Sequence, residues 1–96
     1  VERSARLGTW LAERLDAIVD AHPAAGSTRG LGLMRALEVV GPEGTASSLS
    51  GEALRRGLIV LPEGTALAFT PPLTVTEAQL DHAVGVVEAL VSGVAP

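Results

Sequence analysis

The chain has 96 residues, of which 47% are apolar, and a formal net charge of −4. Its cationic side chains are all arginines and it has no cysteine, so it supplies no Schiff-base amine, no thiol nucleophile and no thiolate metal ligand. The negative charge and the scarcity of aromatics (Trp10 and Phe69) disfavour nucleic-acid binding, which needs basic surfaces and stacking rings. The length suits one domain, over residues 1–96, that buries about 60–65% of its unfolded surface.

Neither a targeting segment nor a membrane segment is visible in the pattern of apolar residues. No apolar run approaches the roughly 20 residues that cross a bilayer, and no signal-peptide pattern opens the chain. We therefore expect a cytoplasmic protein with no membrane partner. The chain begins at Val1 and enters helix-like sequence at once, so we also expect a piece of a longer polypeptide.

Apolar residues recur at helical spacing near both ends of the chain. Residues 3–21 predict an amphipathic helix, which ends before Pro23 because proline disfavours helix at the residue that precedes it. The last helix is predicted to begin after Thr76, which forms a capping box with Gln79 three residues later, and to continue to Gly93.

Three strands and one further helix are predicted between these two helices. In chain order they are a strand over 33–40, a helix over 45–56, and strands over 58–61 and 66–70. The Pro-Glu-Gly-Thr segment at 62–65 predicts a hairpin turn. The order helix, strand, helix, strand, strand, helix predicts an α+β fold, with a small three-stranded, largely antiparallel sheet covered on one face by helices.

Residue types that often carry chemistry have structural explanations in this chain. Gly30 and Gly32 precede a predicted strand and not a helix, so we expect them to permit a turn or a close backbone approach, not to bind a dinucleotide. Glu77 and Asp81 share a face near the start of a predicted helix, where carboxylates complement the helix dipole. The two histidines lie far apart and show no ligand spacing. The residues alone therefore predict no catalytic group and no metal site.

A double-proline corner, Pro71-Pro72, ends one predicted strand and leads into the last helix. Together with two earlier segments it resembles the C-terminal small domain of class III, pyridoxal-phosphate-dependent aminotransferases. The segments are Arg-Gly-Leu-Gly-Leu-Met at 29–34 with Ala-Leu-Glu at 36–38, Arg-Gly-Leu-Ile-Val at 56–60, and Pro-Pro-Leu-Thr-Val-Thr-Glu at 71–77. The resemblance implies a fold-type-I enzyme, a homodimer, and transfer of an amino group between an amine or amino acid and a 2-oxo acid or aldehyde. It leaves open whether the parent enzyme is a transaminase, a decarboxylase or a racemase.

The same resemblance implies substrate contacts at Ala68 and Thr70. In members that act on α- or ω-amino acids, an arginine often lies three residues before the double proline and binds a substrate carboxylate. In this sequence that position is Ala68. We therefore expect either that another group binds the carboxylate or that this end of the substrate is an amine or an apolar group.

In this family the residues that hold the cofactor belong to a large domain that is absent from this chain. They are the lysine, the phosphate cup and the aromatic residue that stacks on the ring. We expect pyridoxal phosphate to be bound by the parent enzyme and not by this segment, and the isolated chain to be inactive. The expected partners are the remainder of the parent polypeptide and a small-molecule amine or amino acid.

A competing interpretation is a free-standing α+β regulatory or protein-interaction module without catalysis. A fragment would expose an apolar face where the rest of the enzyme packs, and would tend to associate. An independent module would be monomeric or closed by symmetry.

Overall fold

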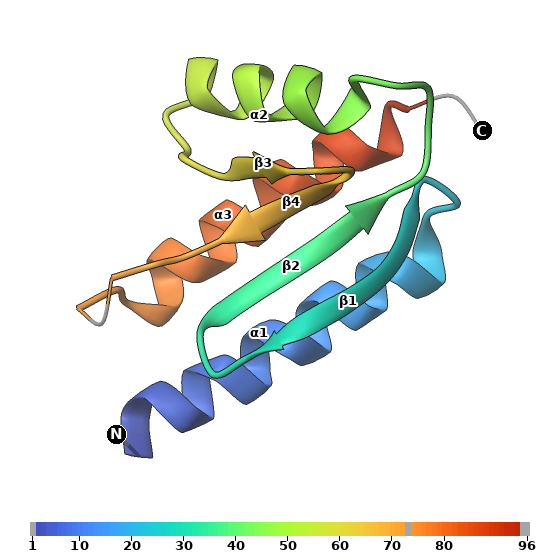
Figure 1. Ribbon diagram of the computed structural model, residues 1–96. Coiled ribbons are helices and arrows are strands. Elements are labelled where there is room, and N and C mark those ends of the chain that lie inside the picture. Colours follow the sequence, from blue (N-terminus) through green and yellow to red (C-terminus); the bar gives the residue numbers. More distant parts are fainter. Residues whose placement is uncertain (1, 73, 95–96) are drawn as a thin grey trace.

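The computed structural model describes residues 2–72 and 74–94, and in these residues the chain forms three helices and four strands (Figure 1). In chain order they are α1 (Glu2–Ala21), β1 (Ala25–Leu31), β2 (Met34–Val39), α2 (Thr45–Arg55), β3 (Leu61–Glu63), β4 (Ala66–Phe69) and α3 (Glu77–Ser92). Val1, Leu73, Ala95 and Pro96 lie outside the described residues, and one of them, Leu73, is a position of the third motif.

The four strands form one antiparallel sheet in the order β1-β2-β4-β3. Helices α1 and α3 contact each other and lie across one face of this sheet, whereas α2 lies beside the edge strand β3 and contacts α3 (Figure 1). Within the described residues, no helix covers the opposite face, which we call the open face. The predicted α+β class and the cover of helices on one face are confirmed.

The core lies between the sheet and helices α1 and α3. Leu37, Leu67 and Phe69 reach it from the two central strands, and the apolar stripes of α1 and α3 meet them. The largest fully buried side chains are Leu11, Leu15, Ile18, Leu37, Leu67, Leu80, Val84, Val87 and Val91. Because burial of one such side chain is worth about 1.5–3 kcal/mol, this cluster is the main source of stability. Its members on α1 and α3 are apolar positions that helical spacing predicts.

The prediction of three strands is wrong, because residues 25–31 form a fourth strand, β1, at one edge of the sheet. Most residues of β1 are glycines or have polar side chains, and only Ala25 is buried. The sequence therefore shows no alternation of apolar and polar residues. Leu31 pairs with Met34, which leaves Gly32 and Leu33 as a two-residue turn. Gly32 adopts a φ of 54°, in the left-handed region that such a turn uses.

The predicted strand that begins at residue 58 is also misplaced, since β3 begins three residues later. The Leu58 N–H donates to the Ala53 carbonyl at the end of α2, at 2.9 Å, and Ser50 Oγ donates to the Val60 carbonyl at 2.6 Å. Helix α2 therefore uses backbone groups that a longer strand would need. Pro62 lies within β3, where an edge strand tolerates the missing N–H.

In the described part of the chain, side-chain contacts join α1 to α3 and to the residue before its N-cap. They include Arg3 to the Val75 carbonyl, Arg14 to the Asp81 carboxylate, and His22 Nε2 to Glu88 Oε2 at 3.0 Å. The contacts follow the two helices in the same order along the chain, so they fix the relative position of α1 and α3 along their length.

Candidate functional site

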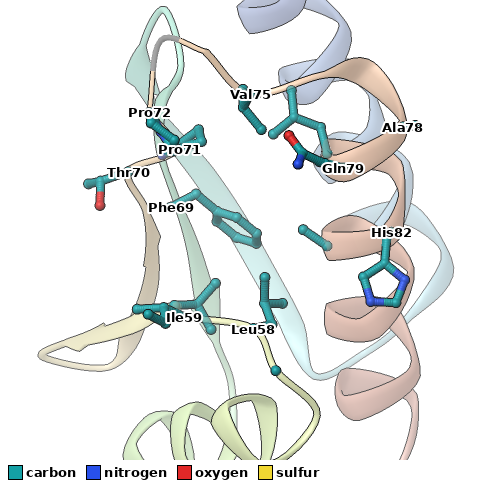
Figure 2. A pocket seen from close by; sticks show the side chains of 14 residues that line it. Leu58, Ile59, Phe69, Thr70, Pro71, Pro72, Val75, Ala78, Gln79 and His82 are labelled. Carbon is teal, nitrogen blue, oxygen red and sulfur yellow. The ribbon is translucent and has the colours of Figure 1, made fainter.

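The double-proline corner links β4 to α3 and forms one wall of a hollow (Figure 2). β4 ends at Phe69, because Pro71 and Pro72 have no N–H to extend the sheet. α3 begins with the predicted capping box, in which the Gln79 N–H donates to Thr76 Oγ1 at 3.1 Å and the Thr76 N–H donates to Gln79 Oε1 at 2.9 Å. The corner and the cap together fix the point at which α3 leaves the end of β4.

This hollow is apolar, with a volume of about 670 Å³, and lies between the corner, the first half of α3 and the segment that follows α2. Figure 2 shows Phe69 and Leu58 on its inner side, facing α3. Its polar lining residues include Gln79, which is engaged in the cap, and His82, which is exposed. The described residues that line the hollow therefore offer apolar contact and shape, but no pair of groups arranged for acid–base chemistry.

The predicted substrate residues Ala68 and Thr70 lie on a second, smaller hollow of about 250 Å³. Ala68 is half-buried and Thr70 is exposed. Across the sheet, Ala68 pairs with Ala36 of β2 and Leu61 of β3, and Ala36 pairs with Arg29 of β1. Paired residues of neighbouring strands point to the same face, so these four side chains form one row across the open face.

Arg29 reaches across the open face to two carboxylates, one on β2 and one on β3. Its Nη1 lies 3.2 Å from Glu38 Oε2, and its Nη2 lies 3.6 Å from Glu63 Oε1. Glu38 also accepts a hydrogen bond from the Thr65 hydroxyl. This hydrogen bond is the largest cause that holds the pKa of Glu38 below its ordinary value, and the contact with Arg29 is a smaller cause in the same direction. Desolvation acts in the opposite direction. We call Arg29, Glu38 and Glu63 the Arg29 cluster.

The glycines of the Gly-Leu-Gly segment have the structural role that the sequence predicts. Gly30 adopts a φ of 141°, and a side chain there would lie 2.0 Å from the Met34 carbonyl oxygen. Gly32 is approached by α1 so closely that a Cβ on Gly8 would lie 2.6 Å from its backbone. The segment lies in a hairpin and does not precede a helix, so it lacks the free helix N–H groups of a dinucleotide site.

The chain does not fit pyridoxal phosphate by itself. It contains no lysine for a Schiff base. Of the arginines that line the second hollow, Arg29 is engaged by carboxylates, and Arg35 donates to the carbonyls of Gly32 at 2.7 Å and Gly30 at 3.2 Å. In the described part of the chain, no three possible metal ligands come together, and no helix combines the length and the apolar character that a membrane crossing needs.

The Arg29 cluster is the feature of this surface that sequence reasoning misses. Without β1, Arg29 cannot be placed in register with Ala36, and the row that includes Ala68 is not visible. The available signal is the Leu-Gly-Leu-Met segment at 31–34, where a glycine occupies the first central position of a two-residue hairpin turn.

Comparison with known proteins identifies relatives along almost the whole chain. The family model described as aminotransferase class-III matches residues 1–91. The chain is 34% identical, over 95% of its length, to the diaminobutyrate–2-oxoglutarate transaminase of Halomonas elongata, of which it covers 22%. It is 38% identical, over 92% of its length, to the L-lysine-epsilon aminotransferase of Amycolatopsis lactamdurans, of which it covers 19%.

The fold is also similar to part of a solved enzyme. The lysine aminotransferase from M. tuberculosis superposes with a TM-score of 0.86 at 35% sequence identity, over 94% of this chain and 21% of that chain. The chain thus spans about a fifth of the length of the relatives that it matches.

Proposed function

Because the chain belongs to the class-III aminotransferase family, we propose that it is the C-terminal small domain of an enzyme of that family. The parent enzyme transfers an amino group between an amine or amino acid and a 2-oxo acid or aldehyde. The observation that carries the family part of this proposal is the match over residues 1–91, supported by a fold shared with part of an aminotransferase. The C-terminal location rests on the motif resemblance alone.

The proposed division of labour assigns the cofactor to the rest of the parent polypeptide. Pyridoxal phosphate, when bound there, supplies an electron sink for the carbanion that amino transfer requires. The absence of lysine from this chain supports the assignment, since no side chain here can hold the cofactor covalently. The chain's own contribution is a wall for the substrate, formed by the row that contains Ala68 and by Thr70 at the end of the same strand.

The proposed partners are the remainder of the parent polypeptide, a second copy of the enzyme in a homodimer, and a small amine or amino acid, in the cytoplasm. Large apolar side chains that the structure leaves exposed support a surface for the parent polypeptide. They include Leu31 and Met34 at the hairpin of β1 and β2, and Ile59 beside the apolar hollow.

The cofactor assignment is tested by comparing the isolated 96 residues with the full-length protein. We expect the full-length protein to show the absorbance band of bound pyridoxal phosphate and to transfer amino groups, and the isolated chain to show neither. A cofactor band on the isolated chain would contradict the division of labour. A full-length protein that binds no cofactor would contradict the proposed function itself.

The proposed substrate wall is tested by an Ala68→Arg variant of the full-length enzyme. A guanidinium at this position would form a bidentate contact with a substrate carboxylate, worth roughly 1.5–3 kcal/mol. We expect kcat/KM for amino-acid donors to rise about ten- to a hundredfold relative to plain amines. An unchanged ratio would show that position 68 does not contact the substrate.

A further inference from the structure

The open face beside Ala68 has a charge arrangement that bears on which substrates the enzyme accepts. The pairing register of the described strands places three charged residues on this face, namely Arg29, Glu38 and Glu63. Arg35 pairs with Phe69 and so starts from the helix-covered face, and its guanidinium is committed to two carbonyls of the hairpin. Both arginines line the hollow beside Ala68, and Arg29 is the one that the strand register places in the same row as Ala68.

A substrate carboxylate would have to compete for Arg29, because two carboxylates of the chain already contact it. Glu38 receives a hydrogen bond from Arg29 and another from Thr65, so it is fixed from two sides. Glu63 approaches from the opposite edge strand, on the far side of β4. In the hollow beside Ala68, Arg29 is thus paired with carboxylates and Arg35 is bonded to two carbonyls, so an added carboxylate would find both guanidinium groups already engaged and would meet Glu63 at short range.

The small side chains of the central strands make this arrangement possible. Arg29 starts on β1 and Glu63 on β3, so their ion pair spans β2 and β4, which carry alanines at 36, 66 and 68 on this face. The hollow that remains is lined by these alanines at 36 and 68 and by Met34, besides the charged groups. Its free surface is thus mainly apolar.

We propose that the Arg29 cluster is a specificity determinant, which masks the cation beside Ala68 so that this subsite accepts an uncharged, apolar end of the amino donor and rejects a carboxylate. The inference rests on the proposed function, since it assumes that the row containing Ala68 faces the substrate. The sequence leaves two expectations open at Ala68: another group binds a substrate carboxylate, or this end of the substrate is an amine or an apolar group. The proposal selects the apolar group.

The test compares two donors of matched length, butan-1-amine and 4-aminobutyrate, with the full-length enzyme. The half-reaction with donor alone, followed by cofactor absorbance, isolates donor specificity. We expect the wild type to prefer butan-1-amine. A Glu38→Gln/Glu63→Gln double variant should unmask Arg29 and shift the kcat/KM ratio toward 4-aminobutyrate by about ten- to a hundredfold. A triple variant that adds Arg29→Gln should lose this shift, which a merely structural effect of the glutamates would not do.

Calorimetric titration with glutarate gives a readout that does not depend on turnover. We expect binding at least about tenfold tighter to the double variant than to the wild type. Glu52→Gln on α2 is the matched control, because it removes a carboxylate from the ion pairs with Arg55 and Arg56, away from the open face. If the double variant folds poorly, the single Glu63→Gln variant replaces it, because this side chain is mostly exposed. We expect it to shift the donor ratio and the glutarate affinity in the same direction by a smaller factor.

The two proposals fail in different ways. An enzyme that transfers amino groups but prefers 4-aminobutyrate, or prefers 1,4-diaminobutane to butan-1-amine more than tenfold, would overturn the apolar subsite and leave the proposed function intact. An unchanged donor ratio and unchanged glutarate affinity in the double variant would overturn the masking of Arg29. A full-length protein without any half-reaction would overturn the proposed function, and glutarate binding would still report whether the cluster masks Arg29.

Discussion

Single glycines in this fold differ sharply in whether they tolerate a side chain. Gly8 lies on α1 against the hairpin turn, and a Cβ there would lie 2.6 Å from the Gly32 backbone, which cannot rotate away. We expect Gly8→Ala to cost about 1–3 kcal/mol of unfolding free energy, more than the helical gain of about 0.5–1 kcal/mol from replacing glycine. Gly85→Ala on α3 is the control, because nothing lies within 4 Å of its Cβ position, and it should stabilise. Denaturant unfolding of both variants measures the difference, and equal effects would disprove the close approach.

The charge of Glu38 makes the stability of the fold depend on pH in the acid range. Its pKa in the folded state is below the ordinary 4.5, first because of the Thr65 hydrogen bond and then because of Arg29. These contacts therefore stabilise the fold above about pH 4.5, and the stabilisation is lost as the pH falls through the lower, folded-state pKa. We expect Glu38→Gln to be less stable than the wild type near pH 7, and the gap to narrow in acid. A gap that does not depend on pH would show that the charge of Glu38 is not involved.

At the scale of elements, the start of α3 depends on one side chain. The hydroxyl of Thr76 accepts the Gln79 N–H, and its loss leaves that donor without a partner in the first turn. We expect Thr76→Ala to cost about 1 kcal/mol. Thr9→Ala in α1 is the matched control, since the Thr9 hydroxyl only donates back to the Ala5 carbonyl within a helix and its removal should be neutral or favourable. Thermal melts would contradict the cap's importance if both variants behaved alike.

The elements also show what a sequence reveals about this fold and what it conceals. α1 and α3 are predicted to within a residue or two, because their buried stripes and the Thr76 cap are local signals. β1 is not predicted, because an edge strand that exposes most of its side chains needs no alternation of apolar and polar residues. Its pairing with β2 is visible only in the three-dimensional structure. The candidate site divides in the same way. Ala68 and Thr70 are predicted as substrate contacts from the motif beside them, and this stays a prediction, whereas the Arg29 cluster requires the register of all four strands.

At the scale of the whole molecule, the sheet is covered on one face only. On one face, the helices bury Leu37, Leu67 and Phe69. On the other face, Leu31 and Met34 form a cross-strand pair at the hairpin of β1 and β2, and they are 86% and 67% exposed. A pair of large apolar side chains at a hairpin tip has no role in the core that the structure describes. Under the proposed function, this hairpin tip is a candidate contact surface for the rest of the parent enzyme.

The exposed hairpin tip predicts how the isolated chain behaves in solution. Without a partner surface, we expect the isolated 96 residues to associate, with a sedimentation coefficient that rises with concentration. Replacing Leu31 and Met34 with serine should reduce this association and leave the melting temperature unchanged, because neither side chain is buried. Leu54→Ser is the control, since Leu54 is 62% exposed on α2, outside the sheet, and its loss should leave association unchanged. A chain that stays monomeric at all concentrations and unfolds cooperatively would instead favour the free-standing module, because a complete domain needs no further surface to close its core.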